Sequence, residues 1–493
     1  MLNPGTNQTV EVLMTKKILF RIAWALMPIL IGGGLYAQQS AQDPLAGVWQ
    51  GTMQTKIGPM DVFFTIEKKE GNGYIAKIDI PAQKVRNMPG TAVRFAAPDL
   101  VLDFSSFGII FEGKVNSDFS IITGQFKLGE DRMALVLRRS AGVPEMRRPQ
   151  DPQKPYPYEE IEVRIPNTQA GISLAGTLTI PSGAGPFPAV VLVTGSGPND
   201  RDEALAGHRP FLVIADALTR RGIAVLRCDD RGVGKSEGDF HRATTVDFAS
   251  DAQASWDFLI RQPRIDGHKV GLLGHSEGGL IGPMVAAENQ KVAFVVLMAG
   301  TGIPGERLAL MQVEAVSRTR GTGEAAIGKE QRFYERLFQI MKTQGNARAA
   351  EADIRPIITQ TLAGMSETEK KELNMSEPSL IQDMTEYLAD YPWNRFFMIY
   401  DPAPALRKIH CPALVLNGDK DTQVPADINL TAIEQALKDA GNSRVEIHKL
   451  PGLNHLFQTA KTGDPREYRR IEETISPAVL QLIGDWILGN VQK

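Results

Sequence analysis

Alternation of hydrophobic and polar residues is the main pattern of residues 43–140, and it predicts a small all-β domain. The clearest alternation, interrupted by Gly, Asn and Asp turns, lies in 61–66, 74–80, 100–104, 109–113 and 121–126. A period of two residues places every second side chain on the same face of a sheet. We expect a meander or a lipocalin-like half-barrel, used either for ligand binding or for packing and dimerisation beside a larger domain.

A different pattern begins near residue 159, where continuous apolar runs replace the alternation. These runs have the length of buried strands and lie at 189–194, 223–227, 269–273 and 412–416. Each leads, directly or after a residue or two, into a loop containing Gly or Asp. The prolines of 141–158 predict a stiff extended linker between the two parts of the chain.

The run at 269–273 leads into Gly274-His-Ser276-Glu-Gly278 and then into small and apolar residues, which is the order strand, sharp turn, helix. The two glycines remove side chains that would clash at such a turn, and the serine is held strained with its hydroxyl exposed. We therefore interpret Ser276 as a nucleophile. Because the chain has 46 glycines, a glycine-rich turn capped by serine is the alternative, and further residues must decide between the two.

An acid and a base follow Ser276 along the chain. Asp419 and Asp421 lie in the loop after 412–416, and His455 lies in a Pro-Gly loop after a last alternating strand. One carboxylate would orient the imidazole of His455, which takes the serine proton, and the other would be a turn-stabilising residue. We interpret His448, inside the strand, as a surface or structural residue. Such a triad needs no metal.

These motifs, together with 222–236, make residues 159–493 resemble the α/β-hydrolase superfamily, in particular bacterial carboxylesterases of prolyl-oligopeptidase-like or serine-aminopeptidase-like type. The spacing Gly-x-x-Asp-x-x-Val-Pro, familiar from this superfamily, selects Asp421 as the triad acid. The resemblance implies an α/β-hydrolase fold with a mostly parallel sheet flanked by helices, ester or amide substrates, and no cofactor. It does not fix the acyl group, because one fold hosts many chemistries.

The same resemblance assigns the oxyanion hole to the backbone N–H groups of Ser196 and Glu277. A Gly-rich loop after a strand also suggests phosphate binding, but neither Gly-x-Gly-x-x-Gly nor a Walker lysine is present. Asp230 and Arg231 are expected to brace the loops around the site, and contact of Arg231 with an acidic substrate is the alternative.

The charged segment 304–400 carries apolar residues at helical spacing, most clearly in 329–341. In a hydrolase this position indicates a helical cap over the site. Trp393, Phe396 and Phe397 would then line the acyl pocket, with plain packing of the cap on the core as the alternative. An enclosed pocket favours short to medium acyl chains.

Residues 1–37 have a basic start, an apolar core and a small residue before a polar stretch, which is the pattern of a signal peptide. Met14 is an alternative start, and a retained membrane anchor is the minor alternative. We expect export to the periplasm or medium, with no stable membrane insertion after signal removal. Cys228 and Cys411 would lie at opposite edges of a parallel sheet, which predicts no disulfide.

We predict an exported serine carboxylesterase that acts on small-molecule esters through Ser276, His455 and Asp421, without metal or cofactor. A net charge of only −3 gives no electrostatic reason to expect nucleic acid as a partner, and a homodimer stays open. The alternative enzyme is a serine aminopeptidase or acylaminoacyl-type peptidase. The alternative from another class is a non-catalytic protein that binds a ligand through its β domain.

Overall fold

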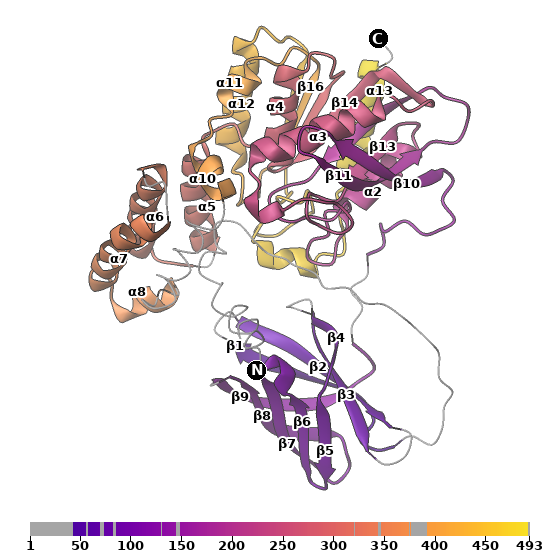
Figure 1. Ribbon diagram of the computed structural model, residues 1–493. Helices are drawn as coiled ribbons and strands as arrows, with labels where there is room; N and C mark the ends of the chain where they lie inside the picture. The colour runs from indigo at the N-terminus through magenta and orange to yellow at the C-terminus, as the bar shows by residue number, and fades with distance from the viewer. Residues whose placement is uncertain are drawn as a thin grey trace. The chain divides into compact units, whose positions relative to one another are not determined.

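The structure, a computed structural model, describes residues 43–491 apart from 56–57, 70–72, 82–84, 130, 144–147, 320, 344–346, 374 and 376–391. The described chain divides into two compact units, one before Arg148 and one from Arg148 onward. The first is an all-β unit, and the second combines a sheet with helices (Figure 1).

A nine-stranded antiparallel sheet forms the first unit, in the order β4-β3-β2-β1-β9-β8-β7-β6-β5. Its strands are β1 (Gly47–Thr55), β2 (Gly58–Lys68), β3 (Tyr74–Ile80), β4 (Val85–Pro89), β5 (Ala92–Ala96), β6 (Asp99–Phe104), β7 (Ile109–Val115), β8 (Ile121–Leu128) and β9 (Asp131–Ser140). Strands that pair are consecutive in sequence except for β1 and β9. The all-β meander predicted from the alternation is confirmed.

The turn between β4 and β5 hydrogen-bonds to strands near both edges of this sheet. Gly90 N–H donates to the carbonyl of Ala76 in β3, and Thr91 N–H donates to that of Asp103 in β6, both at 2.7 Å. The unit has one apolar core, in which the ring centroids of Phe64 and Phe111 lie 5.4 Å apart. The chain thus bridges the two edges of the sheet, which goes further than the half-barrel expected from the sequence.

An eight-stranded sheet forms the centre of the second unit, in the order β10-β11-β13-β12-β14-β15-β16-β17. Its strands are β10 (Glu159–Asn167), β11 (Ile172–Ile180), β12 (Phe187–Val193), β13 (Ala224–Cys228), β14 (Ile265–His275), β15 (Val295–Met298), β16 (Ala413–Gly418) and β17 (Val445–Leu450). The six strands from β12 to β17 are parallel, and β10 and β11 pair in antiparallel fashion. Parallel strands end at one edge, so the loops that follow them meet there.

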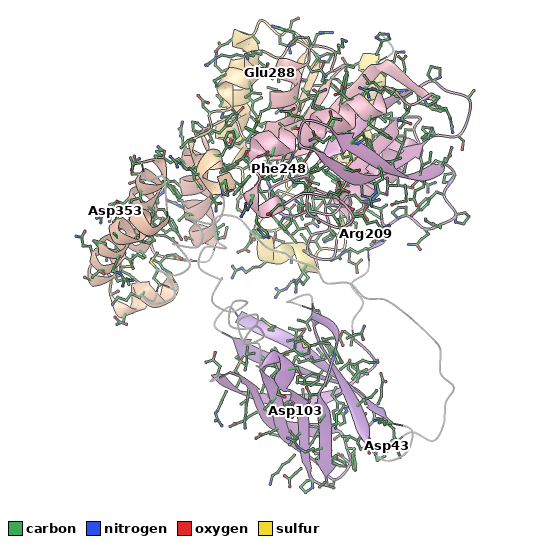
Figure 2. The ribbon with its side chains drawn as sticks, in the orientation of Figure 1. Asp43, Asp103, Arg209, Phe248, Glu288 and Asp353 are labelled. Carbon is green, nitrogen blue, oxygen red and sulfur yellow. The ribbon has the colours of Figure 1, made fainter. Side chains whose placement is uncertain are left out.

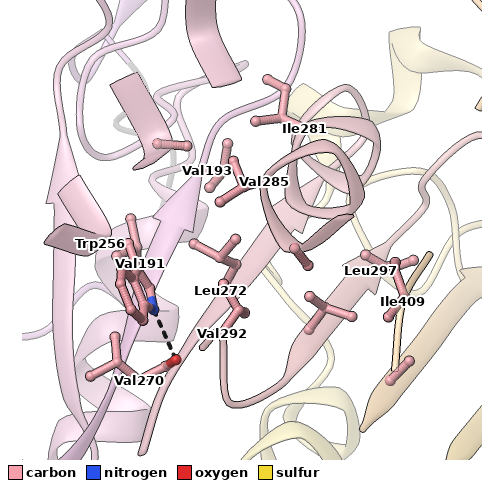
Figure 3. Packing of buried hydrophobic residues seen from close by; sticks show 14 of the residues in the cluster. Val191, Val193, Trp256, Val270, Leu272, Ile281, Val285, Val292, Leu297 and Ile409 are labelled. Carbon is pink, nitrogen blue, oxygen red and sulfur yellow. Dashed lines mark hydrogen bonds between the residues drawn. The ribbon is translucent and has the colours of Figure 1, made fainter. Parts of the chain in front are cut away.

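Helices cover both faces of this sheet: α2 (Pro210–Thr219), α3 (Thr245–Leu259), α4 (Gly278–Glu288), α11 (Ala403–Leu406), α12 (Ala426–Asp439) and α13 (Pro477–Val491). Apolar side chains of α3, α4, α11 and α12 share one core with the sheet, and those of α2 and α13 share another. Phe248 belongs to α3 and Glu288 ends α4 (Figure 2). In the first core the indole N–H of Trp256 donates to the carbonyl of Val270 at 3.0 Å (Figure 3).

A helical insertion between β15 and β16 confirms the predicted cap. It comprises α5 (Gly305–Thr319), α6 (Glu324–Thr343), α7 (Ala347–Ala363), α8 (Glu367–Glu372) and α10 (Pro392–Ile399). Buried aromatic residues such as Phe333, Tyr334 and Phe338 give these helices a core of their own. Close packing joins its first and last described helices, because a Cβ at Gly305 of α5 would lie 1.9 Å from the carbonyl oxygen of Phe397 in α10.

Residues 148–158 pack on the second unit, which differs from the extended linker predicted over 141–158. The guanidinium of Arg148 donates to four carbonyls, those of Ala206, Gly207, Arg469 and Ile471, at 2.9–3.2 Å. Proline spacing indicated an extended chain, but it carries no information on such distant carbonyl partners. The end of the predicted linker is therefore part of the second unit.

Residues 1–37, predicted as a signal peptide, lie outside the described part of the chain. Within the described part, no helix has both the length and the apolar character needed to cross a membrane. Cys228 and Cys411 are free, and three strands separate β13 from β16 in the sheet. Burial raises the pKa of Cys228 to about 12 and that of Cys411 to about 11, so both side chains are neutral thiols near pH 7.

Candidate active site

Ser276 occupies the turn between β14 and α4. Its φ of 54° lies in the left-handed region, where a side chain is strained. A Cβ at Gly274 would lie 1.9 Å from the carbonyl oxygen of Gly278, and one at Gly278 would lie 2.0 Å from that of Val193. The Ser276 N–H donates to the carbonyl of Met298 in β15 at 2.8 Å. Strand, sharp turn and helix are therefore all present at these residues.

The loop after β16 brings Asp421 to the imidazole of His455, with Oδ2 of the aspartate 2.7 Å from Nδ1 of the histidine. The other carboxylate oxygen accepts the backbone N–H groups of Gln423 and Val424, both at 2.8 Å. The side chain of Asp421 is 0% exposed and that of His455 is 6% exposed. The carboxylate is thus fixed in orientation and keeps a proton on Nδ1, which leaves Nε2 able to accept one.

The two competing residues occupy other places. Asp419 Oδ1 accepts the backbone N–H of Gly452 at 2.7 Å and so stabilises the turn before the histidine loop. His448 lies in β17 at the surface, with Nε2 2.7 Å from the carboxylate of Glu446. Of the two aspartates in the loop, only Asp421 contacts His455.

Side chains fix the shape of the loop that follows β12. Asn199 Nδ2 donates to the carbonyls of Gly195 and Gly197 at 2.8 and 3.0 Å. Asp230 accepts the hydroxyl of Thr194 at 2.6 Å and the backbone N–H of Asn199 at 2.9 Å. Burial raises the pKa of Asp230 well above its usual range. This carboxyl group therefore braces the loop, as the sequence predicted.

The orientation of one peptide group in this loop follows from these bonds. The Gly195 carbonyl points toward Asn199, and in a planar trans peptide the next N–H, that of Ser196, points the opposite way. The Gly195 N–H itself donates to Glu203 at 2.7 Å. A Cβ at Gly195 would lie 3.2 Å from that of Ser276, so the loop runs directly beside the serine.

A buried pair that the sequence analysis missed, His275 and Glu203, connects these loops. His275 Nδ1 lies 3.0 Å from Oε1 of Glu203, and the same oxygen accepts the Gly195 N–H. His275 Nε2 donates to the carbonyl of His455 at 3.0 Å. The two imidazole rings lie 4.8 Å apart. Burial opposes the charged form of His275, but the facing carboxylate outweighs it and raises its pKa. Position directly before the serine was the only sequence signal for this histidine.

Glu277, the residue after the serine, is the N-cap of α4 and has a buried carboxyl group. Its Oε1 accepts the hydroxyl of Thr245 at 2.7 Å and the indole N–H of Trp393 at 2.6 Å. Burial raises the pKa of this carboxyl above its usual range. The sequence assigned a role only to the Glu277 backbone, so these side-chain contacts were not anticipated.

The three cap aromatics predicted to line a pocket have different surroundings. Trp393 is buried against Glu277 and stacks on Phe397 at 4.9 Å between ring centroids. Phe397 also packs near Val424, three residues after Asp421. Phe396 is half-buried, with its ring 5.2 Å from that of Tyr400 in the same segment. Trp393 and Phe397 thus lie at the border between cap and site, and the lining of an acyl pocket stays a prediction.

Arg231 has a structural environment. Its Nε and Nη2 lie 2.7 and 2.9 Å from the two carboxylate oxygens of Asp251, and Nη2 also donates to the carbonyl of Asp247 at 2.7 Å. The arginine is buried, and both partners belong to α3. These contacts favour the bracing role over contact with an acidic substrate.

The assembled groups have the parts that acyl transfer needs: a hydroxyl on a strained turn, an oriented imidazole, and an N–H directed by its peptide plane. Within the residues that the structure describes, no three His, Cys, Asp or Glu side chains are grouped so as to hold a metal ion.

Residues 190–470 match the alpha/beta hydrolase family. The match covers more than half of the chain and includes the elbow, the acid and the histidine. The protein therefore belongs to the alpha/beta hydrolase family.

Similarity to individual proteins extends over about two thirds of the chain. Esterase EstD of Thermotoga maritima is 26% identical over 337 residues, which is 68% of either chain. The Pyrococcus furiosus esterase Pf2001 has a TM-score of 0.41 and 16% identity, covering 71% of this chain and 99% of that one. Est1E from Butyrivibrio proteoclasticus, solved with ferulic acid bound, has a TM-score of 0.38 and 16% identity, with coverages of 67% and 100%.

Proposed function

We propose that this protein is a serine carboxylesterase with Ser276 as nucleophile, His455 as general base and acid, and Asp421 as the group that orients the histidine. The observation that carries the proposal is the buried 2.7 Å hydrogen bond between Asp421 and His455. It is found together with a serine on a sharp turn, whose φ is 54°. The similarity to an esterase of Thermotoga maritima supports the choice of esters within the family.

In the acylation step, Ser276 Oγ attacks the ester carbonyl carbon while His455 Nε2 takes the hydroxyl proton. The carbonyl electron pair moves to oxygen, and the backbone N–H groups of Ser196 and Glu277 bind the resulting oxyanion. Collapse of this intermediate breaks the bond to the alcohol oxygen, which receives the proton from His455. Removal of one such donor typically costs a factor of about 10² to 10³ in kcat.

In the deacylation step, water replaces the alcohol as the attacking group. His455 takes a proton from the water as its oxygen bonds to the acyl carbon, and the same N–H groups bind the second oxyanion. The bond to Ser276 Oγ then breaks, the proton passes to that oxygen, and a carboxylic acid leaves. Both steps use one imidazole, because it returns to its starting protonation state.

We infer that the substrates are esters with short to medium acyl chains, since the cap helix α10 contacts Glu277, the residue after the nucleophile. The bond of Trp393 to Glu277, and the packing of Phe397 against a cluster that includes Val424, support this inference. Export to the periplasm or medium stays a prediction.

Two experiments test the proposal. A fluorophosphonate probe should label the protein and should not label Ser276→Ala, which should remain folded with ester hydrolysis near background. A panel of p-nitrophenyl esters and aminoacyl anilides then distinguishes esterase from peptidase activity. Preferential hydrolysis of the anilides would replace the carboxylesterase by a peptidase. Absence of both labelling and turnover in the folded wild-type protein would contradict the proposal.

A further inference from the structure

The buried carboxylate of Glu277 joins three separate segments around the nucleophile. Its Oε1 accepts hydrogen bonds from Thr245, the first residue of α3, and from Trp393 of the cap helix α10, at 2.7 and 2.6 Å. Burial raises the pKa of this carboxyl group, and Ser196, from the loop beside the serine, is among the groups that oppose this rise. The glutamate is only 3% exposed. One side chain thus links the cap, a helix of the hydrolase core and the loop proposed to bind the oxyanion.

The backbone of the same residue determines how α4 begins. The Glu277 carbonyl accepts the N–H groups of Leu280 and Ile281 at 2.8 and 2.9 Å, which form the first turn of the helix. Its own N–H belongs to the peptide that follows Ser276 directly. The side chain and this amide nitrogen share the Glu277 Cα, so hydrogen bonds that hold the side chain in place also restrain the orientation of the amide proposed to stabilise the oxyanion.

Because Glu277 is buried, its carboxyl group depends on the hydrogen bonds from Thr245 and Trp393. The named donors to this carboxyl group are neutral groups, and a buried carboxyl oxygen depends on such bonds because each lost donor leaves it without a hydrogen-bond partner. Displacement of α10 away from the core would remove the Trp393 donor. Glu277 would then keep the Thr245 bond and lose its restraint from the cap, so the orientation of the elbow amide would be less firmly fixed.

We propose that Glu277 is a positioning residue through which the closed cap fixes the oxyanion-binding amide, with Trp393 as the cap's contact. This inference rests on the proposed esterase function. Trp393 thereby has a role different from lining an acyl pocket: its indole N–H, rather than its ring surface, is the important group. Closure of the cap and assembly of the oxyanion hole become one event.

The decisive comparison uses two tryptophans with similar buried hydrogen bonds. Trp393→Phe keeps a ring and removes the donor to Glu277. Trp256→Phe removes a 3.0 Å bond to the carbonyl of Val270 inside the core and is the matched control. The measurements are kcat and KM for p-nitrophenyl acetate and butyrate, the inhibition constant of an aliphatic trifluoromethyl ketone, and the thermal midpoint of each variant.

We expect Trp393→Phe to lower kcat about tenfold for both esters with KM changed less than about twofold, because oxyanion binding acts on the transition state. The trifluoromethyl ketone, which forms an oxyanion with the serine, should bind more weakly by a similar factor. Trp256→Phe should lower the thermal midpoint and leave kcat near the wild-type value. A loss in both variants that follows only the thermal midpoint would contradict the inference.

Conservative replacement provides a second test that does not depend on Trp393. Glu277→Gln keeps an acceptor oxygen and should retain most of kcat, whereas Glu277→Ala should lose about as much as Trp393→Phe or more. Equal activity of Gln, Ala and wild type would overturn the inference. A change in the ratio of acetate to butyrate hydrolysis without loss of kcat would also overturn it in favour of a pocket role. Inactive and unlabelled wild-type protein would instead contradict the proposed function itself.

Discussion

At the scale of single residues, two aspartates in one loop have become chemically different through their hydrogen bonds. Asp421 contacts His455 with one oxygen and two backbone N–H groups with the other, whereas Asp419 holds the turn at Gly452. A carboxylate that orients the catalytic imidazole cannot be replaced by an amide without disturbing the histidine tautomer. The roles of the two residues can therefore be separated by the same substitution.

We expect Asp421→Asn to lower kcat/KM for p-nitrophenyl butyrate by a factor of about 10³ to 10⁴. Asp419→Asn should lower it by less than about threefold, because a surface turn contributes mainly to stability. Circular dichroism of both variants serves as the folding control. If Asp419→Asn were the more damaging change in a folded protein, the assignment of the triad acid would be wrong.

The buried pair His275 and Glu203 predicts a particular dependence of stability on pH. The pKa of His275 is raised in the folded protein, so the folded state binds more protons than the unfolded state just above the ordinary histidine pKa of about 6.5. Its stabilising contribution is complete below that value and is lost as pH rises through the raised pKa. Glu203, Asp421 and His455 are the ionisable groups that face it.

Urea unfolding of wild type and His275→Gln between about pH 6 and 9 tests this expectation. The difference in free energy of unfolding should be largest at the acid end and shrink as pH rises. His208 is the control. Burial lowers its pKa to about 4, so its protonation changes the free energy of unfolding mainly between about pH 4 and 6.5. The stability difference between wild type and His208→Gln should thus increase slightly from about pH 6 to 7.5 and stay constant above it, which is the opposite of the trend expected for His275. A His275 difference that grew with pH would contradict the raised pKa.

At the scale of elements, residues 148–158 behave as part of the hydrolase unit. Gln150 adds to the contacts of Arg148, since its Nε2 donates to the carbonyl of Ile475 at 2.6 Å and its Oε1 accepts the N–H of Thr474. Tyr158 donates its hydroxyl to Asp216 of α2 at 2.9 Å. The partners near 470–475 follow the histidine loop, so this segment supports the chain near the site.

Two truncated chains, one starting at Arg148 and one at Tyr158, should differ in stability. Loss of the Arg148 and Gln150 bonds should lower the free energy of unfolding by about 2 to 4 kcal/mol, at roughly 1 kcal/mol for each buried bond, with some of the bonds cooperating. The chain that starts at Arg148 should keep wild-type activity on small soluble esters, because all residues of the proposed triad lie within it. Urea unfolding and p-nitrophenyl acetate hydrolysis measure the two effects. Equal stability of both chains would mean that the segment is a true linker.

The sequence predicted those elements whose signal is local. The apolar runs identified the strands, and the glycines at 274 and 278 identified the elbow, because a Cβ at either position would lie within about 2 Å of a backbone oxygen. The pairing of β1 with β9 could not be predicted, since alternation defines a strand and its faces but not a partner at the far end of a domain. The Arg148 contacts and the His275 pair were missed for the same reason: their partners lie far away in sequence.

At the scale of the whole molecule, we expect the cap to decide which substrates reach the proposed triad. Its helices have their own apolar core, and α10 is fastened to the site by the bond between Trp393 and Glu277. We expect a cap held in this way to enclose the acyl group instead of leaving an open trough for a lipid surface. Each methylene of the acyl chain adds about 0.8 kcal/mol of binding while room remains, and overpacking reverses the trend afterwards.

We therefore expect kcat/KM for p-nitrophenyl esters to rise and then fall within short to medium acyl chains, with little action on emulsified triglyceride. Phe396 is the aromatic residue best suited to test the pocket, because it is half-buried and lacks the tie to Glu277. Phe396→Ala should move the optimum toward longer chains, whereas exposed Ile399→Ala in the same helix should not. An optimum that stays in place in both variants would assign Phe396 to packing within the cap. Efficient hydrolysis of long-chain triglyceride by the wild-type protein would contradict an enclosed pocket altogether.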